Sequence, residues 1–249
     1  MKRNGFMNYN NFVLELKRLK LTVFSLNDAQ RIINKKRAYT SVYLSRFIKS
    51  KRLVLIKKGI YALPSSLFEE IATSIVESSY ITMLSALYHY SIIDQQPNDT
   101  IVFNSSISRK LDIRIPDGAY RIKLVKITPK RLFGFERIDT QNGYIYIATP
   151  EKAIVDALYL PKLCAQSYIE DALLDSDKID IKKLINFANA MESHVVLIRL
   201  QLLFNKLNIT GYDKFIKVKR IIPKKFNLSK ITTKKETKLN YIFGDSDIR

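Results

Sequence analysis

Two short apolar runs, residues 53–56 and 60–63, lie on either side of Lys57, Lys58 and Gly59, and this pattern constrains the fold more than any other feature. Apolar runs of this length around a glycine-containing turn are typical of a β-hairpin. Glycine adopts the positive φ of such a turn without the steric cost that other residues meet. We therefore expect a hairpin whose tip carries two lysines.

Three helical patterns precede this hairpin. Residues 9–19 have apolar positions at a period of 3.6 residues. Ser25 is placed to cap the next helix, with Asp28 three residues later as in a capping box. A third helix is expected to begin near Tyr39 or Thr40. Three helices followed by a hairpin predict a winged helix-turn-helix.

The third predicted helix has two faces of different character. Leu44, Phe47 and Ile48, with Thr40 or Ser41 one turn earlier, form a stripe that we expect to be buried. An opposite face with arginine, lysine and tyrosine is suited to insertion into the major groove of DNA. The residues expected on this exposed face are Tyr39, Val42, Tyr43, Arg46 and Lys49.

The positive charge of the chain is concentrated near its N-terminus. The net charge is +19, and residues 1–64 contribute +13, from 15 Lys and Arg against 2 Asp and Glu. Residues 65–166 are neutral, with 11 residues of each sign. A general lysine bias would be spread evenly, so this distribution indicates a polyanionic partner for the first 64 residues. The alternative is a solubilising surface. Residues 193–249 carry +9, which predicts a second electropositive face or a solvated one.

Candidate contacts to double-stranded DNA follow from these two patterns. Arg46 can pair with guanine through two hydrogen bonds, and Tyr39, Thr40 and Tyr43 share the start and the exposed face of its helix. The alternative for the tyrosines is packing against the hairpin. Cations on both sides of the helix are candidate phosphate contacts, with a solvated face as their alternative. The complete predicted set is Lys35, Lys36, Arg37, Tyr39, Thr40, Ser41, Tyr43, Arg46, Lys49, Lys51, Arg52, Lys57 and Lys58.

Beyond the hairpin, helical and β-like patterns are mixed. Ser65 or Ser66 is placed to cap a helix, and residues 78–93 are typical of another. Four β-like stretches follow, and Thr149 with Pro150 marks a strong helix start. The predicted fold class is α+β: a winged helix-turn-helix at residues 1–64, then a mixed α/β C-terminal domain at residues 65–249, with helices and strands mixed in 65–160 and mainly helices and a basic tail in 161–249.

Few other residues suggest chemistry. Glu151 and Asp156 would serve as acids at a catalytic or partner site, but the pattern favours a helix-dipole role for Glu151 and a solvated or salt-bridged Asp156. His89 lies between aromatic residues and is interpreted as a core histidine, and Cys164 as structural. With two histidines and one cysteine, we expect no zinc or other metal site. We also expect no cofactor and no catalytic residues.

Composition also bears on location. No run of 18 or more apolar residues occurs, and no secretory leader is recognisable, so we expect no membrane partner. The single cysteine cannot form an intramolecular disulfide, which fits a cytoplasmic protein.

Four motifs occur in an order and spacing that resemble a known family. They are KKGIYALP at residues 57–64, SSYITMLSALYHYSIIDQQP at 78–97, ATPEKAIVDALYLP at 148–161 and VVLIRLQLLFNKLNI at 195–209. In these motifs the chain resembles the AbiEi antitoxins of type IV toxin–antitoxin systems. It departs from them at Gln201, where glycine usually follows Arg-Leu.

The resemblance implies a role in abortive infection, a form of phage defence. It implies a cytoplasmic antitoxin without enzymatic activity that represses its own operon by binding DNA repeats in its promoter, expected to be inverted repeats. The second domain would counteract a nucleotidyltransferase-like toxin, and the two proteins need not form a stable complex.

Two other functions stay open at this point. One is a stand-alone winged-helix regulator whose second domain senses a ligand. The other is a nucleic-acid-processing enzyme, a nuclease or a nucleotidyltransferase. Glu236 and Lys238 form a Glu-x-Lys triplet of the kind that nucleases use, but no clear strands flank it, and the Gly-Ser dyad of a nucleotidyltransferase is absent.

Overall fold

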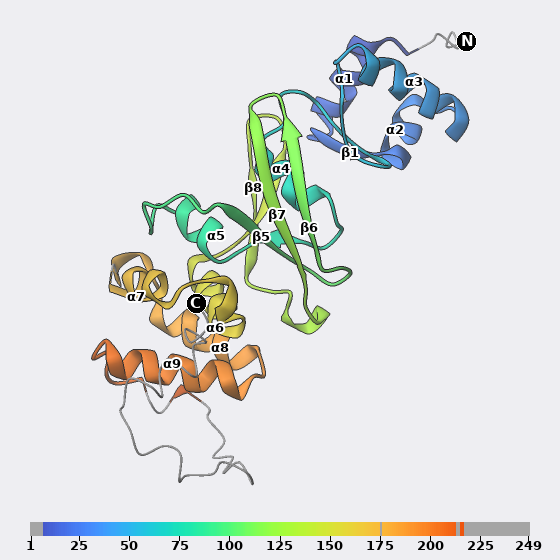
Figure 1. Ribbon diagram of the computed structural model, residues 1–249. Coiled ribbons are helices and arrows are strands. Elements are labelled where there is room, and N and C mark those ends of the chain that lie inside the picture. Colours follow the sequence, from blue (N-terminus) through green and yellow to red (C-terminus); the bar gives the residue numbers. More distant parts are fainter. Residues whose placement is uncertain (1–6, 175, 213–214, 217–249) are drawn as a thin grey trace. The chain divides into compact units, whose positions relative to one another are not determined.

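The computed structural model describes residues 7–174, 176–212 and 215–216 (Figure 1). Helices are combined with two β-sheets, which confirms the α+β fold class. Among the described helices, none has the length and apolar character needed to cross a membrane. The predicted basic tail beyond residue 216 and the Glu236 triplet lie outside the described residues.

The chain divides into two compact units that alternate along the sequence. The first unit comprises residues 1–81, 98–127 and 136–147, and the second comprises residues 82–97, 128–135 and 148–249. The domain boundary predicted after residue 64 falls inside the first unit.

The first part of the first unit, residues 7–63, is called the headpiece. Its strands form an antiparallel sheet in the order β1-β3-β2. The predicted hairpin is therefore present as β2 and β3, and β1, which was not predicted, pairs with its second strand. The elements are α1 (Tyr9–Arg18), β1 (Val23–Ser25), α2 (Leu26–Ile33), α3 (Arg37–Lys49), β2 (Val54–Lys57) and β3 (Ile60–Ala62).

Local sequence accounts for how these elements begin and end. Ser25 and Asp28 form the predicted capping box: the Asp28 N–H donates to Ser25 Oγ at 3.2 Å, and the Ser25 N–H donates to Asp28 Oδ2 at 2.9 Å. Asn34 follows α2 with a φ of 52°, a conformation that asparagine tolerates better than most residues. Gly59 supplies a φ of 85° in the hairpin turn, as predicted.

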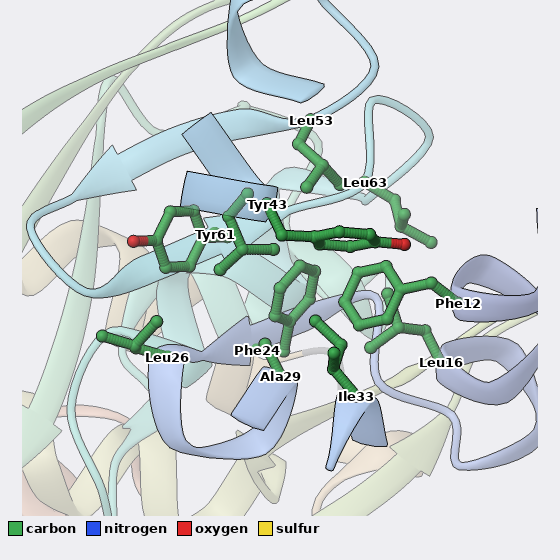
Figure 2. Packing of buried hydrophobic residues seen from close by; sticks show 11 residues of the cluster. Phe12, Leu16, Phe24, Leu26, Ala29, Ile33, Tyr43, Leu53, Tyr61 and Leu63 are labelled. Atoms are coloured by element: carbon green, nitrogen blue, oxygen red, sulfur yellow. The ribbon is translucent and has the colours of Figure 1, made fainter. Parts of the chain in front are cut away.

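Aromatic rings fill the core of the headpiece (Figure 2). The Phe12 ring of α1 packs edge-on against Phe24 and Tyr43, with centroid distances of 5.5 and 5.7 Å. Phe24 also stacks on Tyr61 of β3 at 5.8 Å. Such aromatic pairs contribute about 0.5–1.5 kcal/mol each beyond the burial of their area. Helix α1 therefore packs on the same core as α3 and the hairpin.

A six-stranded mixed sheet and helix α4 (Phe68–Ser74) belong to the rest of the first unit. The order of the sheet is β6-β7-β5-β4-β9-β8, with β6 and β7 as an antiparallel hairpin and β5 parallel to β7. The four predicted β-like stretches correspond to β5, β7, β8 and β9. Strand β6 was missed, although the alternation of charged and apolar residues in RKLDIRI is typical of a half-exposed strand. The strands are β4 (Tyr80–Ile81), β5 (Asp99–Asn104), β6 (Arg109–Ile115), β7 (Gly118–Lys126), β8 (Phe135–Asp139) and β9 (Tyr144–Ala148).

The helix predicted over residues 78–93 is wrong in its first half. Tyr80–Ile81 form strand β4, and only α5 (Leu84–His89) is helical. Met83 separates the two with a φ of 55°. The pairing of β4 with β5 and β9 supplies contacts that outweigh the local helical propensity of this segment.

Helix α4 (Phe68–Ser74) begins later than predicted, and neither predicted serine caps it. Ser66 instead donates its hydroxyl to the Thr22 carbonyl at 2.9 Å. The start of the helix is satisfied by Glu70, whose carboxylate accepts the Leu67 N–H at 3.1 Å.

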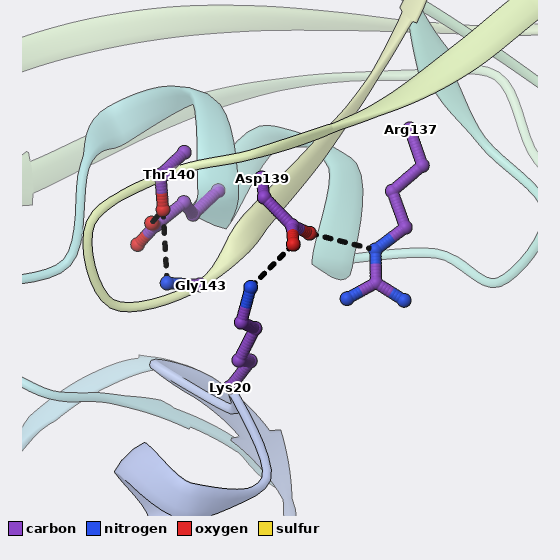
Figure 3. Close-up of polar contacts among 6 residues, drawn as sticks. Lys20, Arg137, Asp139, Thr140 and Gly143 are labelled. Carbon is purple, nitrogen blue, oxygen red and sulfur yellow. Dashed lines mark hydrogen bonds and ion pairs between the residues drawn. The ribbon is translucent and has the colours of Figure 1, made fainter.

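Glu70 is also the centre of a buried polar cluster. Its carboxylate accepts hydrogen bonds from Thr22 Oγ1 at 2.5 Å and from Thr140 Oγ1. Thr140 Oγ1 in turn accepts the Gly143 N–H at 2.9 Å (Figure 3). A Cβ at Gly143 would lie 2.7 Å from Thr22 Oγ1, so only glycine fits without a shift. The cluster joins the segment before β1 to α4 and to the β8–β9 turn.

An exposed ion pair lies beside this cluster (Figure 3). Lys20 pairs with Asp139, which also accepts a hydrogen bond from Arg137 Nε at 3.2 Å. The hydrogen bond from Lys20 lowers the pKa of Asp139. Because all three side chains are well exposed, this contact contributes less to stability than the buried Glu70 cluster.

The second unit is mainly helical. Helix α6 starts as predicted, with Thr149 at the N-cap and Pro150 in the first turn. Ala153, Ile154, Ala157 and Leu158 are buried on its inner side. The helices are α5, α6 (Pro150–Tyr159), α7 (Gln166–Leu174), α8 (Ile181–Ala190) and α9 (His194–Lys206), with 3-10 turns at Pro129–Arg131, Pro161–Leu163 and Ser176–Lys178.

A buried ion pair stands in the middle of this unit. Lys152 and Asp156, one turn apart on α6, are fully buried and in contact. Asp156 also accepts a hydrogen bond from Thr82 Oγ1 at 2.7 Å, and Lys152 Nζ lies 4.7 Å from the centroid of the Phe133 ring. Each buried charge thus has a partner of opposite sign within the unit.

Candidate nucleic-acid interface

Helix α3 has one face in the headpiece core and one face in solvent. Leu44 is fully buried, and Phe47 and Ile48 are half-buried, which confirms the predicted apolar stripe. Two residues of the solvent face were not predicted, although they lie one turn from Val42 on either side. They are Ala38 and Ser45, and the exposed residues of this face are Ala38, Val42, Ser45, Arg46 and Lys49.

Two residues predicted to contact bases are buried instead. Thr40 has no exposed surface, and Tyr43 is 8% exposed. The Tyr43 ring packs edge-on against Phe12 of α1 and Phe47 of α3, and burial raises the pKa of Tyr43 to about 12. The prediction that Tyr43 lies on the exposed face is therefore wrong, whereas the burial of Thr40 agrees with its alternative place on the apolar stripe. The physical reason is that Phe12 of α1 packs against Tyr43, so the buried side of α3 extends beyond the apolar stripe.

The start of α3 also differs from the prediction. The helix begins at Arg37, with Lys36 as its N-cap, whereas the predicted start was Tyr39 or Thr40. Tyr39 and Ser41 are half-buried at the edges of the solvent face, and the Tyr39 ring stacks on Tyr43 at 6.4 Å. Arg37 therefore belongs to the first helical turn rather than to the preceding loop.

The predicted cations are all exposed, and the ion pairs found among the described residues involve none of them. Two of them have other contacts. Arg37 Nη1 donates to Asn27 Oδ1 at 3.2 Å, and the Arg52 guanidinium lies 5.3 Å from the centroid of the Tyr9 ring. The set comprises Lys35, Lys36, Arg37, Arg46, Lys49, Lys51, Arg52, Lys57 and Lys58.

A shallow, open depression of about 680 Å³ lies along α2 and the turn into α3. Its lining is entirely polar and carries three cations but no acid. Such a surface attracts anionic groups and offers amide donors to them. The lining residues are Asn27, Gln30, Arg31, Asn34, Lys35 and Lys36. Only the two lysines were predicted as contacts; the others were missed because they lie on the helix before the expected recognition helix.

The hairpin tip is tied to the start of α2. The Leu26 N–H donates to the Gly59 carbonyl at 2.9 Å, which holds the turn with Lys57 and Lys58 beside that helix. The register of β2 shifts between Leu55 and Lys57, and such irregularities increase the local twist of a hairpin. Both lysines remain exposed at the tip.

The two acids of α6 that were considered as site residues, Glu151 and Asp156, form ion pairs within the second unit. Glu151 is buried and forms an ion pair with Lys183 at 2.8 Å. Burial opposes ionisation of Glu151, but the hydrogen bond from Lys183 and others from backbone N–H groups lower its pKa below the ordinary value. Asp156 is salt-bridged to Lys152, as one expectation had it, and is not solvated.

Two further residues were assigned structural roles from the sequence. His89 is exposed, so its interpretation as a core histidine is wrong. Cys164 is buried, and burial raises the pKa of its thiol to about 12, which disfavours the reactive thiolate. Within the described part of the chain, no three His, Cys, Asp or Glu side chains are grouped as a metal site requires.

No protein-family model matches this chain, and no curated protein matches it. Its function must therefore be inferred from the geometry and charge of the headpiece, together with the sequence motifs.

Proposed function

We propose that the chain is a DNA-binding transcriptional repressor whose headpiece acts as a winged helix-turn-helix. Three features support this: the helices α2 and α3 joined by a short turn, the β2–β3 hairpin that follows, and the solvent face of α3. The observation that carries the proposal is the arrangement of exposed cations at both ends of α3 and at the hairpin tip, without acidic partners among the described residues. Phosphates on both sides of a major groove are the partner that such an arrangement suits.

In this proposal α3 enters the major groove and the hairpin lies along the backbone. Arg46, exposed on the solvent face, is the candidate for a two-hydrogen-bond contact to guanine. The exposed cations near the two ends of α3 and at the hairpin tip contact phosphates. They are Lys35, Lys36, Arg37, Lys49, Lys51, Arg52, Lys57 and Lys58. Tyr39 and Ser41, at the edges of the face, are placed for backbone contacts. Thr40 and Tyr43 hold the helix on the core.

We further propose that the chain is a cytoplasmic antitoxin that represses its own operon at inverted repeats and counteracts a nucleotidyltransferase-like toxin. The support is the resemblance of the four sequence motifs to the AbiEi antitoxins. Coexpression of the full chain with a nucleotidyltransferase-like gene from the same operon tests this part. Restored growth is the expected result, and unrelieved toxicity would contradict it.

DNA binding is tested by fluorescence anisotropy with the duplex immediately upstream of the gene and a scrambled duplex of equal length. We expect the upstream duplex to bind about a hundredfold or more tighter. If six phosphates are contacted, log K should fall with log salt at a slope of about −5. Equal affinity for both duplexes together with a slope near zero would exclude the proposal.

A variant pair sharpens the test. Arg46→Ala should lose about 1–3 kcal/mol of binding free energy for the upstream duplex and less for the scrambled one, because a base contact is removed. Arg18→Ala is the matched control, since Arg18 is an exposed arginine of α1 that already pairs with Glu15 at 2.9 Å. Equal losses for the two variants would show that Arg46 contributes charge only.

A further inference from the structure

The solvent face of α3 has a central stripe of four residues. Ala38, Val42, Ser45 and Lys49 are spaced by four, three and four positions, so they lie above one another along the helix. All four are exposed. If α3 enters the major groove, this stripe lies nearest the base edges.

The middle of the stripe is apolar and lacks a free hydrogen-bond donor. Val42 is 54% exposed. Ser45, one turn later, donates its hydroxyl to the Ser41 carbonyl at 2.8 Å, so its proton is already used within the helix. Ala38, one turn earlier, has only a methyl group. The small side chains on either side leave Val42 projecting furthest.

This composition restricts the base that Val42 can face. A base edge with an amino group or a carbonyl oxygen that faces the methyl groups of Val42 would lose its water and gain no hydrogen bond from them, which costs free energy. The C5 methyl of thymine is the apolar feature that the bases present in the major groove. An isolated exposed valine is common on protein surfaces, but this one stands at the centre of the face flanked by cations.

We propose that Val42 contacts the C5 methyl group of a thymine in the operator and thereby contributes to specificity. This inference rests on the proposed DNA-binding function. It adds that one base pair, below the middle of α3, is recognised through an apolar contact with Val42, whereas Arg46 recognises its base through hydrogen bonds.

Replacing thymines of the upstream duplex one at a time with deoxyuridine tests the contact, because only the methyl group is removed. We expect one position at which this change weakens binding of the native chain about fourfold, the value for one buried methyl group. At that position the Val42→Ala variant should bind both duplexes alike. Leu14→Ala, at an apolar side chain of α1 that is 66% exposed, is the matched control and should keep the native sensitivity.

The outcomes separate this inference from the function on which it rests. If the upstream duplex is preferred but every deoxyuridine change affects native and Val42→Ala chains equally, the methyl contact is excluded and DNA binding stands. If the native chain does not prefer the upstream duplex, both fail. Since Val42 is exposed, the variant should keep the urea midpoint of the native chain, which excludes misfolding as the cause of any loss.

Discussion

The headpiece and the second unit use charged side chains in opposite ways. In the headpiece, the cations around α3 and at the hairpin tip are exposed, and the ion pairs of the described residues do not include them. In the second unit, Lys152 and Asp156 are fully buried and paired, and buried Glu151 is paired with Lys183. Removing a charge from water costs several kcal/mol, so a buried charge needs a partner within the chain. An exposed charge without one remains available to an external polyanion.

The largest effect on this comparison should come from removing half of the buried pair. Lys152→Met leaves the Asp156 carboxylate without a cation, and we expect a loss of about 3–5 kcal/mol in the free energy of unfolding. Urea titration of the full chain measures it. The double variant Lys152→Met with Asp156→Asn should recover part of the loss, because no buried charge is then unpaired. A single-variant loss below about 1 kcal/mol would contradict the pairing argument.

The Glu70 cluster offers a smaller effect within the first unit. Here a buried carboxylate is held by hydroxyl and backbone donors instead of a cation. In Glu70→Gln, the side-chain NH2 group would face hydrogen-bond donors instead of accepting from them. We therefore expect a loss of about 1–3 kcal/mol in the free energy of unfolding, measured by urea titration. Glu69→Gln, at the exposed neighbouring position in the same helical turn, is the control and should change stability little. Equal losses of stability for the two variants would show that the negative charge at the start of α4, and not the buried cluster, is responsible.

Substitutions in the hairpin turn should reduce stability less than those in the Glu70 cluster. A Cβ at Gly59 meets nothing within 4 Å, so the cost of Gly59→Ala comes from its φ of 85° alone. We expect about 1–2 kcal/mol of destabilisation, read from the thermal midpoint. Gly59→Asn should cost less, since asparagine tolerates positive φ. An alanine variant as stable as the native chain would mean that the turn adopts another conformation.

The hairpin lysines should show the smallest effect on stability and a clear one on binding. Lys57→Gln with Lys58→Gln should change the free energy of unfolding by less than about 0.5 kcal/mol. The salt slope of DNA binding should become shallower by about 2, because two phosphates are no longer neutralised by lysine. Lys162→Gln with Lys182→Gln removes the same charge from exposed positions in the second unit. The same change of slope for both pairs of variants would mean that the total charge of the chain, and not the position of the lysines, determines the salt dependence of DNA binding.

Sequence patterns predicted the elements whose signals are short-range. The capping box of Ser25 and Asp28, the turn at Gly59 and the helix start at Thr149 and Pro150 were all found as expected. Each depends on residues within about four positions of one another. Strands β1 and β4 were missed because they are two or three residues long and exist only through pairing with distant strands.

The candidate interface was predicted in its charge and in most of its orientation, because Val42, Arg46 and Lys49 are exposed as expected, but Tyr43 was placed on the wrong side of α3. The exposure of its cations follows from their type, because lysine and arginine are rarely buried without a partner. The inward position of Tyr43 depends on the ring of Phe12, which lies 31 residues before Tyr43 in the sequence and packs against it.

The sequence by itself determined the capping box of Ser25, the turn at Gly59, the start of α6, the α+β class and the concentration of positive charge in the first 64 residues. Only the tertiary structure decided how far the buried side of α3 extends, which carboxylates are buried and which donors satisfy them. The reason is physical: caps and turns are set by neighbours along the chain, whereas the burial of a side chain depends on every element that packs around it.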